Sequence, residues 1–234
     1  MLVLAIDTAT TDLVTGLVDT ETGQAVDRVI GDTRAHNEQL IPTIEALLAG
    51  AARSYADLDA IVVGTGPGPF TGLRVGMATA SALGVALSLP VHGVCTLDAI
   101  NRGVAARGEG TRLVAIDARR KEVYWAIFQG EERLAGPGVT RPEDLLAAVE
   151  EAAGEAAGGL EHIVIPEAIA PRLPEQLAGL PREWATPRAA GLVGVAQLDC
   201  TPEPLVPLYL RRPDAVPPKP KPRSSALPDV AGLL

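Results

Sequence analysis

Aromatic residues are scarce in this sequence: they make up 3% of 234 residues, with two tryptophans, three tyrosines and two phenylalanines. Hydrophobic residues still amount to 47%, an ordinary share for a globular protein. The core must therefore be packed from Ala, Val, Leu and Ile, which requires a close approach of its elements. A chain of this length buries roughly 70–75% of its unfolded surface, enough for one large domain or two small ones.

Cysteine and positive charge are also in short supply. Cys95 and Cys200 lie far apart and outside any CxxC pattern, so we expect a reducing compartment and no disulfide framework. The formal net charge is −9, which argues against a protein that grips nucleic acid by itself, because phosphate binding needs a basic surface. Two interpretations of the negative charge stay open: it keeps the protein soluble, or the chain is a subunit that meets RNA through a basic partner.

Long hydrophobic runs are missing as well. The longest largely apolar stretch, around 82–89, is too short to span a bilayer. The N-terminus lacks a basic segment and reaches Asp7 early, which predicts a strand and not a signal peptide. We therefore expect a cytoplasmic protein with no membrane contact.

Short apolar runs alternate with amphipathic segments, which is typical of an α/β protein. Strands are predicted at 2–6, 13–18, 24–30, 59–64, 91–94 and 163–165. Helices are predicted from about residue 38, at 73–88, from Thr96, from a Thr140–Glu143 capping box to 153, and at 188–198. Segment 205–210 is predicted to be extended or helical.

An internal repeat organises these elements. Leu-Ala-Ile-Asp at 4–7 recurs as Val-Ala-Ile-Asp at 114–117, and the next strands align without a gap, Leu13 with Val123, Leu17 with Ile127 and Val18 with Phe128. The repeat indicates two lobes built by duplicating one β-hairpin-plus-helix plan. We expect an N-terminal lobe over 1–100 and a smaller, degenerate C-terminal lobe over 101–216, whose last segment could return to the first lobe. The Pro-rich tail, 217–234, is predicted to be disordered.

Two aspartates, Asp7 and Asp117, end matching strands of this repeat. Ligands of open α/β sheets bind beyond the carboxyl ends of the strands, and the doubled hairpin resembles the nucleotide clasp of actin, hexokinase and heat-shock proteins. The alternative is that both aspartates cap their own turns. The first turn has no glycine and the second, Ala-Arg-Arg-Lys-Glu, is bulky and charged. We interpret Asp7, Thr8 and Asp117 as a vestigial nucleotide cleft.

The most specific motif is the Gly- and Pro-rich segment 66–74, which predicts a rigid loop between a buried strand and a helix N-terminus. It is neither a Walker A loop nor GxGxxG. A tight structural turn competes with a partner or nucleotide contact, and Phe70, one of two phenylalanines, favours the contact. The candidate contact residues are Gly66, Pro67, Gly68, Phe70, Thr71, Gly72 and Arg74.

Small residues recur at every fourth position after this loop. They flatten one helix face, either for packing on the chain's own sheet or for a subunit contact. The candidate interface, together with the preceding helix, is Leu40, Ile44, Leu47, Gly76, Ala80 and Gly84. His36, His92 and His162 are isolated, so no metal ligand is assigned, and no nucleophile constellation gives a catalytic residue.

Together these motifs resemble the TsaB family, the tRNA threonylcarbamoyladenosine biosynthesis protein, which is related in sequence to the so-called glycoproteases. The resemblance spans about 2–212 and rests on segments 4–10, 66–76, 117–124 and 207–211, and on His36 with Leu40. It implies an actin-like (ASKHA) fold with two lobes. It further implies a non-catalytic scaffold in the complex that adds a threonylcarbamoyl group to the adenosine next to the tRNA anticodon.

The resemblance also implies partners. These are the catalytic paralogue TsaD in a heterodimer, the ATPase TsaE, and tRNA reached through the complex, with a homodimer when the chain is alone. The paralogue binds its metal with a His-x-x-x-His pair, which here is His36 and Leu40, so the metal site is broken. We expect no cofactor on this chain alone, with ATP or ADP at the complex interface left open. The competing functions are a stand-alone nucleotide-dependent enzyme and a protease, the latter without support in the residues.

Overall fold

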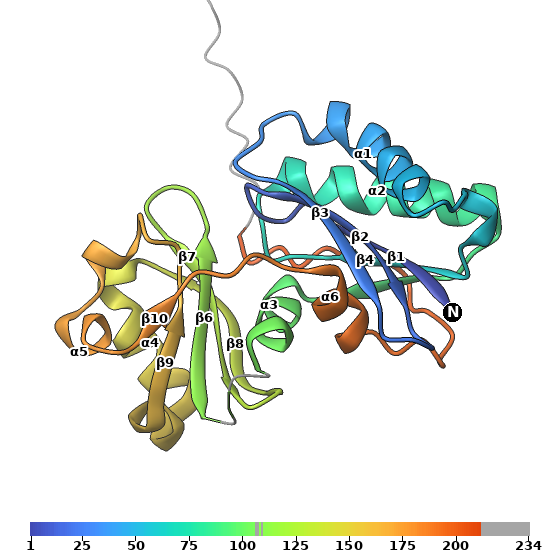
Figure 1. The fold of residues 1–234 in the computed structure, drawn as a ribbon. Helices are drawn as coiled ribbons and strands as arrows, with labels where there is room; N and C mark the ends of the chain where they lie inside the picture. Colours follow the sequence, from blue (N-terminus) through green and yellow to red (C-terminus); the bar gives the residue numbers. More distant parts are fainter. Residues whose placement is uncertain (106–107, 109, 212–234) are drawn as a thin grey trace, which may run out of the picture.

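The computed structural model describes residues 1–105, 108 and 110–211, which form two five-stranded sheets (Figure 1). The predicted tail, 217–234, lies outside the described residues. The first sheet has the order β3-β2-β1-β4-β5, with β2 antiparallel to its neighbours and β4 and β5 parallel to β1. Its strands are β1 (Leu2–Asp7), β2 (Leu13–Asp19), β3 (Ala25–Ile30), β4 (Ala60–Gly64) and β5 (Val91–Val94).

The second sheet repeats this order strand for strand. It runs β8-β7-β6-β9-β10, again with an antiparallel hairpin side and a parallel side. The duplicated plan and the actin-like fold are therefore confirmed. Its strands are β6 (Thr111–Asp117), β7 (Val123–Gln129), β8 (Glu132–Thr140), β9 (Leu160–Val164) and β10 (Arg182–Glu183).

The two hairpins differ by one residue in register. Asp7 pairs with Val14, whereas Asp117 pairs with Val123, so six residues, 8–13, connect the first pair and five, 118–122, the second. The gapless alignment of the two copies is thus correct for the strand bounds and wrong by one residue for the pairing. A one-residue slip turns each side chain to the other face of a strand, and Leu4 accordingly packs in the core beneath α1 and α2, whereas its aligned counterpart Val114 packs with α3.

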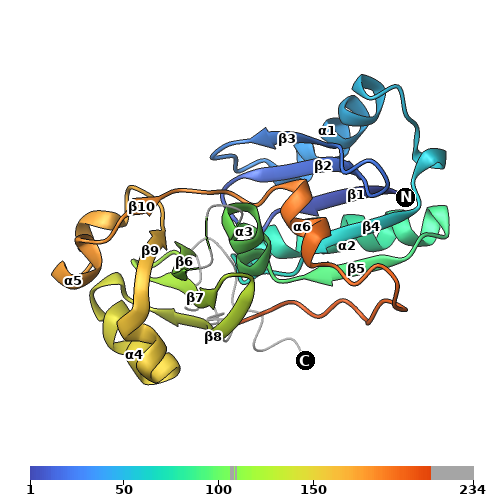
Figure 2. The same ribbon diagram turned by 60° about the horizontal axis from the view of Figure 1, so that its bottom comes forward.

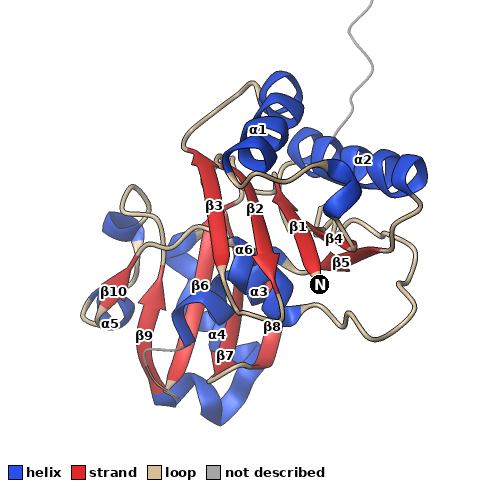
Figure 3. Ribbon diagram, turned by 45° about the vertical axis from the view of Figure 1, so that its right-hand side comes forward, coloured by secondary structure: helices blue, strands red, loops and turns tan. Residues whose placement is uncertain are grey.

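Helices cover both faces of the first sheet. In Figures 1 and 3, α1 (His36–Gly50) and α2 (Phe70–Leu87) lie on one face. On the opposite face, α3 (Thr96–Ala105) and α6 (Ala189–Val195) lie between the two sheets (Figure 2). On the far side of the second sheet lie α4 (Leu145–Ala153) and α5 (Glu175–Ala178). Short 3-10 turns occupy Tyr55–Asp57, Pro142–Asp144, Gly154–Gly159 and Ala170–Arg172.

The helix α3 joins the lobes by packing on both sheets. Its Leu97, Ile100 and Val104 belong to the core under β6 and β7, while its Ala99 packs with α6 against β1 and β4. Small residues allow the close approach expected from the composition: a Cβ on Gly16 of β2 would lie 2.3 Å from the Cβ of Ala189 in α6.

The last described segment lies against the first lobe. Leu205 packs on the core beneath α1 and α2, and the Leu208 N–H donates to the Thr65 carbonyl over 2.8 Å. Between 196 and 211 the chain forms no helix or strand. The domain boundaries predicted from the sequence stay a proposal, and the contact of this segment with the first lobe agrees with the return that was left open.

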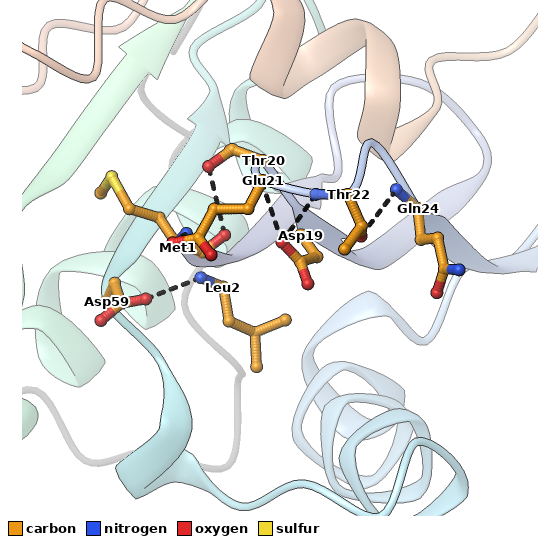
Figure 4. A network of polar contacts seen from close by, with 8 residues as sticks. All are labelled: Met1, Leu2, Asp19, Thr20, Glu21, Thr22, Gln24 and Asp59. Carbon is orange, nitrogen blue, oxygen red and sulfur yellow. Dashed lines mark hydrogen bonds and ion pairs between the residues drawn. The ribbon is translucent and has the colours of Figure 1, made fainter.

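Polar contacts fix the outer end of the first sheet (Figure 4). The Leu2 N–H donates to Asp59 over 2.7 Å, and Asp19 accepts the N–H groups of Glu21 and Thr22 in the β2–β3 turn. These backbone bonds hold the pKa of Asp19 below its usual value. The Met1 ammonium pairs with Glu21 over 3.2 Å, which ties β1 to the same turn.

Several elements differ from the sequence-based expectation. The strand β8 was not predicted, because Gly136-Pro137-Gly138 is typical of a turn. Since β8 lies at the edge of its sheet, the missing N–H of the proline costs no hydrogen bond between strands. Thr140 ends this strand, so the predicted capping box is wrong and α4 begins at Leu145. Phe70 is the first residue of α2 and not part of the loop.

By length and composition α2 is the one helix of the described chain that could cross a membrane, with a mean hydropathy of 1.3 over 18 residues. It is longer than the apolar run found in the sequence. A single such helix is weak evidence for a membrane segment. One side of α2 is buried on the first sheet through Leu73, Gly76, Met77, Ala80 and Gly84, which makes it a core helix of this lobe.

Candidate functional site between the lobes

The carboxyl end of β1 holds a fully buried aspartate. Asp7 has no exposed surface, its Oδ1 accepts the Ala9 N–H over 2.7 Å and its Oδ2 accepts the Thr96 hydroxyl over 2.8 Å. Burial raises the pKa of Asp7 to about 6, against the lowering effect of these two hydrogen bonds. A Cβ on Gly64 would lie 2.0 Å from Oδ2, so protein atoms enclose the carboxylate. Asp7 therefore organises its turn from within.

The next residue joins this turn to α2. The Thr8 hydroxyl donates to the Gly72 carbonyl over 2.7 Å and accepts the Gly76 N–H over 3.0 Å. These are the two groups that an ordinary i to i−4 helical bond would join, so the hydroxyl lies in the helical ladder. A Cβ on Gly76 would come 2.4 Å from the Thr8 oxygen, which explains why glycine occupies this position.

The Gly- and Pro-rich segment packs directly on the same turn. A Cβ on Gly68 would lie 2.3 Å from the Ala9 carbonyl oxygen, and one on Gly72 would lie 2.4 Å from the Thr8 carbonyl oxygen. Gly66 has φ +98, a conformation that side chains rarely adopt. Gly66, Pro67 and Gly68 are buried. Their packing supports the interpretation as a tight structural turn for these three residues.

An exposed cluster forms where this segment enters α2. The rings of Phe70 and Tyr209 stack with centroids 5.2 Å apart, and the Arg74 guanidinium lies 3.6 Å from the Phe70 centroid. Arg74 Nε also donates to the Tyr209 hydroxyl over 3.0 Å. Two motifs 135 residues apart in sequence thus meet, and the contact of Phe70 is with the chain's own last segment.

The second hairpin turn is built differently. Asp117 Oδ1 accepts the Arg119 N–H over 2.9 Å, the bond that Asp7 makes to Ala9, so both aspartates cap their turns as the alternative interpretation predicts. Arg119, Arg120 and Lys121 all have left-handed backbones, with φ between +53 and +64. Arg211 donates to the Ala118 carbonyl over 2.9 Å. Asp117 is partly exposed, unlike Asp7.

The two residues at the positions of the histidine pair, His36 and Leu40, differ in how deeply they are buried. His36 begins α1 and is half-buried, and burial lowers its pKa. Leu40 is 1% exposed and packs in the core of the first lobe. Among the described residues, no group of three or more His, Cys, Asp and Glu side chains is placed to hold a metal ion.

The six predicted interface residues are not surface residues. Leu40, Ile44, Leu47 and Ala80 are each at most 5% exposed, and a Cβ on Gly84 would lie 2.3 Å from the Cγ2 of Val91 in β5. The assignment of these positions to a subunit contact is therefore wrong. The small-residue face packs on the chain's own sheet, which was the competing interpretation.

Sequence reasoning missed three residues of this site. Thr96 was predicted only as the start of a helix, although its hydroxyl donates to Asp7, 89 residues away. Arg34 and Arg119 line one pocket from different lobes, and no spacing in the sequence connects them. A hydrogen bond or a shared pocket between such distant positions depends on the fold.

Comparison with known proteins places these features in a family. The family model described as "TsaD: tRNA N6-adenosine threonylcarbamoyltransferase" matches residues 31–179. The protein TsaB of Escherichia coli, named for tRNA threonylcarbamoyladenosine biosynthesis, is 35% identical over 161 residues, which are 66% of this chain and 69% of that one. The chain belongs to the TsaD–TsaB family.

Mycobacterial relatives of this chain are named as uncharacterized proteins. Rv3421c of Mycobacterium tuberculosis is 48% identical over 92% of this chain and 94% of its own length. ML0378 of Mycobacterium leprae is also 48% identical, and the matched region spans 56% of that longer protein. A Pseudomonas aeruginosa structure, titled as similar to peptidase YEAZ, superposes with a TM-score of 0.70 at 27% identity and covers 90% of this chain and 99% of that one.

Proposed function

We propose that this chain is the non-catalytic partner subunit of a complex that transfers a threonylcarbamoyl group to the adenosine next to the anticodon in tRNA. The partners in this proposal are the catalytic paralogue TsaD, the ATPase TsaE, and tRNA reached through the complex. The family match and the 35% identity to the TsaB of E. coli support it. A cytoplasmic location belongs to the same proposal.

One observation carries the non-catalytic part: both oxygens of Asp7 are engaged within the chain, and the carboxylate has no exposed surface. A carboxylate that holds a metal, its waters or a nucleotide has to reach the ligand. Asp7 instead binds Ala9 and Thr96, and Gly64 closes over it. This geometry supports a structural role and argues against a stand-alone kinase or ATPase whose chemistry depends on Asp7.

The partner surface belongs on the outer faces of α1 and α2 in this proposal, since their inner faces are buried. Val85 is 84% exposed and Ile41 is 37% exposed, both large apolar side chains on these helices. When the partner is absent, the same faces would pair two copies of the chain.

The test is reconstitution with purified components. We expect the chain alone to form no threonylcarbamoyladenosine, and to restore its formation when added to TsaD, TsaE, ATP and the other substrates. The Asp7→Asn variant should restore it as well as the wild type does, because Asn keeps the carbonyl oxygen that accepts the Ala9 N–H.

Two results would contradict the proposal. One is full activity of the catalytic paralogue without this chain. The other is loss of activity in a folded Asp7→Asn complex, which would assign the aspartate a chemical role.

A further inference from the structure

The two lobes meet through a pair of helices that are attached to different lobes. The helix α6 packs on β1 and β4 of the first sheet. The helix α3 starts at the first lobe, where the Thr96 hydroxyl donates to Asp7, but its Asp98 already pairs with Arg133 of β8 over 2.9 Å. Motion of one lobe against the other would therefore turn α3 about its start and displace it along α6.

The contact between α3 and α6 is made of small residues. A Cβ on Gly191 of α6 would lie 2.3 Å from the Ala99 carbonyl oxygen of α3, so the two backbones touch at this point. Small sliding movements of packed helices are one of the ways in which lobes change their relative angle. An attachment at another place would limit such sliding.

Residues 205–211, here called the interlobe tie, form such an attachment. The first part of the tie is bound to the first lobe. The Leu208 N–H donates to the carbonyl of Thr65, the residue after β4, over 2.8 Å. The Tyr209 hydroxyl accepts a hydrogen bond from Arg74 Nε over 3.0 Å. The tie is thus held beside the start of α2 by backbone and side-chain bonds.

The last two residues of the tie are bound to the second lobe. Leu210 packs on the core that α3 forms with β6 and β7. Arg211 donates to the carbonyl of Ala118, the residue after β6, over 2.9 Å, and its guanidinium lies 5.8 Å from the centroid of the Tyr124 ring. Arg211 also forms an ion pair with Glu122. The tie therefore joins the carboxyl ends of β4 and β6 across the lobe boundary.

The tie reaches the second lobe on a different side from the covalent connection 184–188. In Figure 2 that connection runs from β10 to α6 above α3, and the tie runs below α3. A lobe that is attached on both sides of a helix cannot rotate about that helix unless one attachment yields.

We propose that the interlobe tie holds the two lobes at one fixed angle, and that release of Arg211 frees the second lobe to move. Tyr209 is bound to the first lobe and Leu210 to the second. Consecutive Cα atoms lie about 3.8 Å apart, so no slack separates the two anchors. The end of the folded chain thus acts as a latch between the lobes.

Hydrogen exchange of the full chain, followed by NMR, tests whether the two ends of the tie act together. Arg211→Gln removes the second-lobe end, and the Leu208 N–H on the first lobe should then exchange at least about tenfold faster, the effect of losing one charge-assisted hydrogen bond. Arg172→Gln is the matched control, because Arg172 also holds a carbonyl of the second hairpin turn, that of Lys121, and pairs with Glu143, all within the second lobe. It should change the exchange of Leu208 by less than about twofold.

A distance measurement between the lobes tests the fixed angle. Spin labels are attached at Ala56→Cys in the first lobe and Ala152→Cys in the second, both at exposed positions. The exposed Cys200 is replaced by serine, and Cys95 stays unlabelled because burial raises the pKa of its thiol to about 12. The labelled chain is mixed with an excess of unlabelled chain, so that pulsed electron resonance reports distances within one molecule.

The double variant Tyr209→Ala/Arg211→Gln removes both ends of the tie. It should broaden the distribution of distances between the labels, while Arg172→Gln should leave the distribution as it is in the wild type. Thermal unfolding checks that the variants are folded, and Arg211→Gln alone takes the place of the double variant where that one does not fold.

Two results would overturn the inference. One is an exchange rate of Leu208 that Arg211→Gln leaves unchanged, or that Arg172→Gln raises equally. The other is an unchanged distance distribution in the folded double variant, because α3 and α6 would then fix the lobes by themselves. All measurements use the chain alone, so they stand apart from the reconstitution test of the proposed function.

Discussion

At the scale of the residue, the contribution of Asp7 to the stability of the fold depends on pH. Its pKa is about 6 in the folded chain, against an ordinary value of 3.8, because burial disfavours the charged form. The folded state therefore binds a proton more tightly than the unfolded state does. This contribution to stability is fully present below about pH 4 and is lost as the pH rises through 6.

We predict that Asp7→Asn removes this pH dependence. A shift of about two pKa units corresponds to about 3 kcal/mol, so the variant should gain about that much relative to the wild type between pH 4 and pH 7. Urea unfolding of both proteins at the two pH values measures the difference. Taking the difference cancels the opposite contributions of Asp19 and Glu143, whose pKa values are lowered in the fold. A difference that stays constant with pH would contradict the prediction.

The sequence indicates Asp7 and its partner Asp117 but not their different surroundings. A run of apolar residues ending in Asp locates both at strand ends, because strand periodicity is local. The Thr96 hydroxyl that encloses Asp7 comes from another element. Burial of a carboxylate depends on such distant neighbours, so the two strand ends could be located from the sequence and the different surroundings of the two aspartates could not.

At the scale of the element, glycines of α2 allow this helix to pack closely against the first hairpin turn. We predict that Gly76→Ala destabilises the fold by about 1–3 kcal/mol, because the new Cβ would lie 2.4 Å from the Thr8 hydroxyl oxygen that bridges the helix. Gly103→Ala in α3 is the matched control. Its Cβ meets nothing within 4 Å, so alanine should stabilise the chain by roughly 0.5–1 kcal/mol through the helix backbone.

Denaturant unfolding of the two variants separates close packing from helix propensity. If Gly76→Ala also stabilised the chain, the contact with Thr8 would be too loose to explain the glycine.

Most elements followed from periodicity and turn residues, including the amphipathic helix α1 and the five strands of the first sheet. The strand β8 did not, because local preference at Gly136–Gly138 points to a turn and only the edge of a formed sheet tolerates it. The length of the second hairpin turn could not be predicted from the sequence either. The register of strand pairing depends on tertiary contacts as well as on the hydrophobic pattern.

At the scale of the whole molecule, one face of α2 is buried in the first lobe and the other is exposed. The small residues face the chain's own sheet, so Ala80→Leu should lower the stability of the isolated chain by about 1–3 kcal/mol through overpacking. It reports on the core and cannot report on a partner. The outer face has to be tested with a residue that the fold does not use.

We predict that Val85→Glu weakens co-purification with the catalytic paralogue while leaving the isolated chain as stable as the wild type. Val85 is 84% exposed, and surface substitutions away from special features change stability by less than about 0.5 kcal/mol. A carboxylate buried at an apolar contact without a partner is costly, so affinity should fall at least about tenfold. Val26→Glu, at a 53% exposed valine of β3, introduces the same charge elsewhere on the same lobe and should bind normally. Equal binding by Val85→Glu and the wild type would show that the partner docks elsewhere, and equal weakening by both variants would show a response to net charge alone.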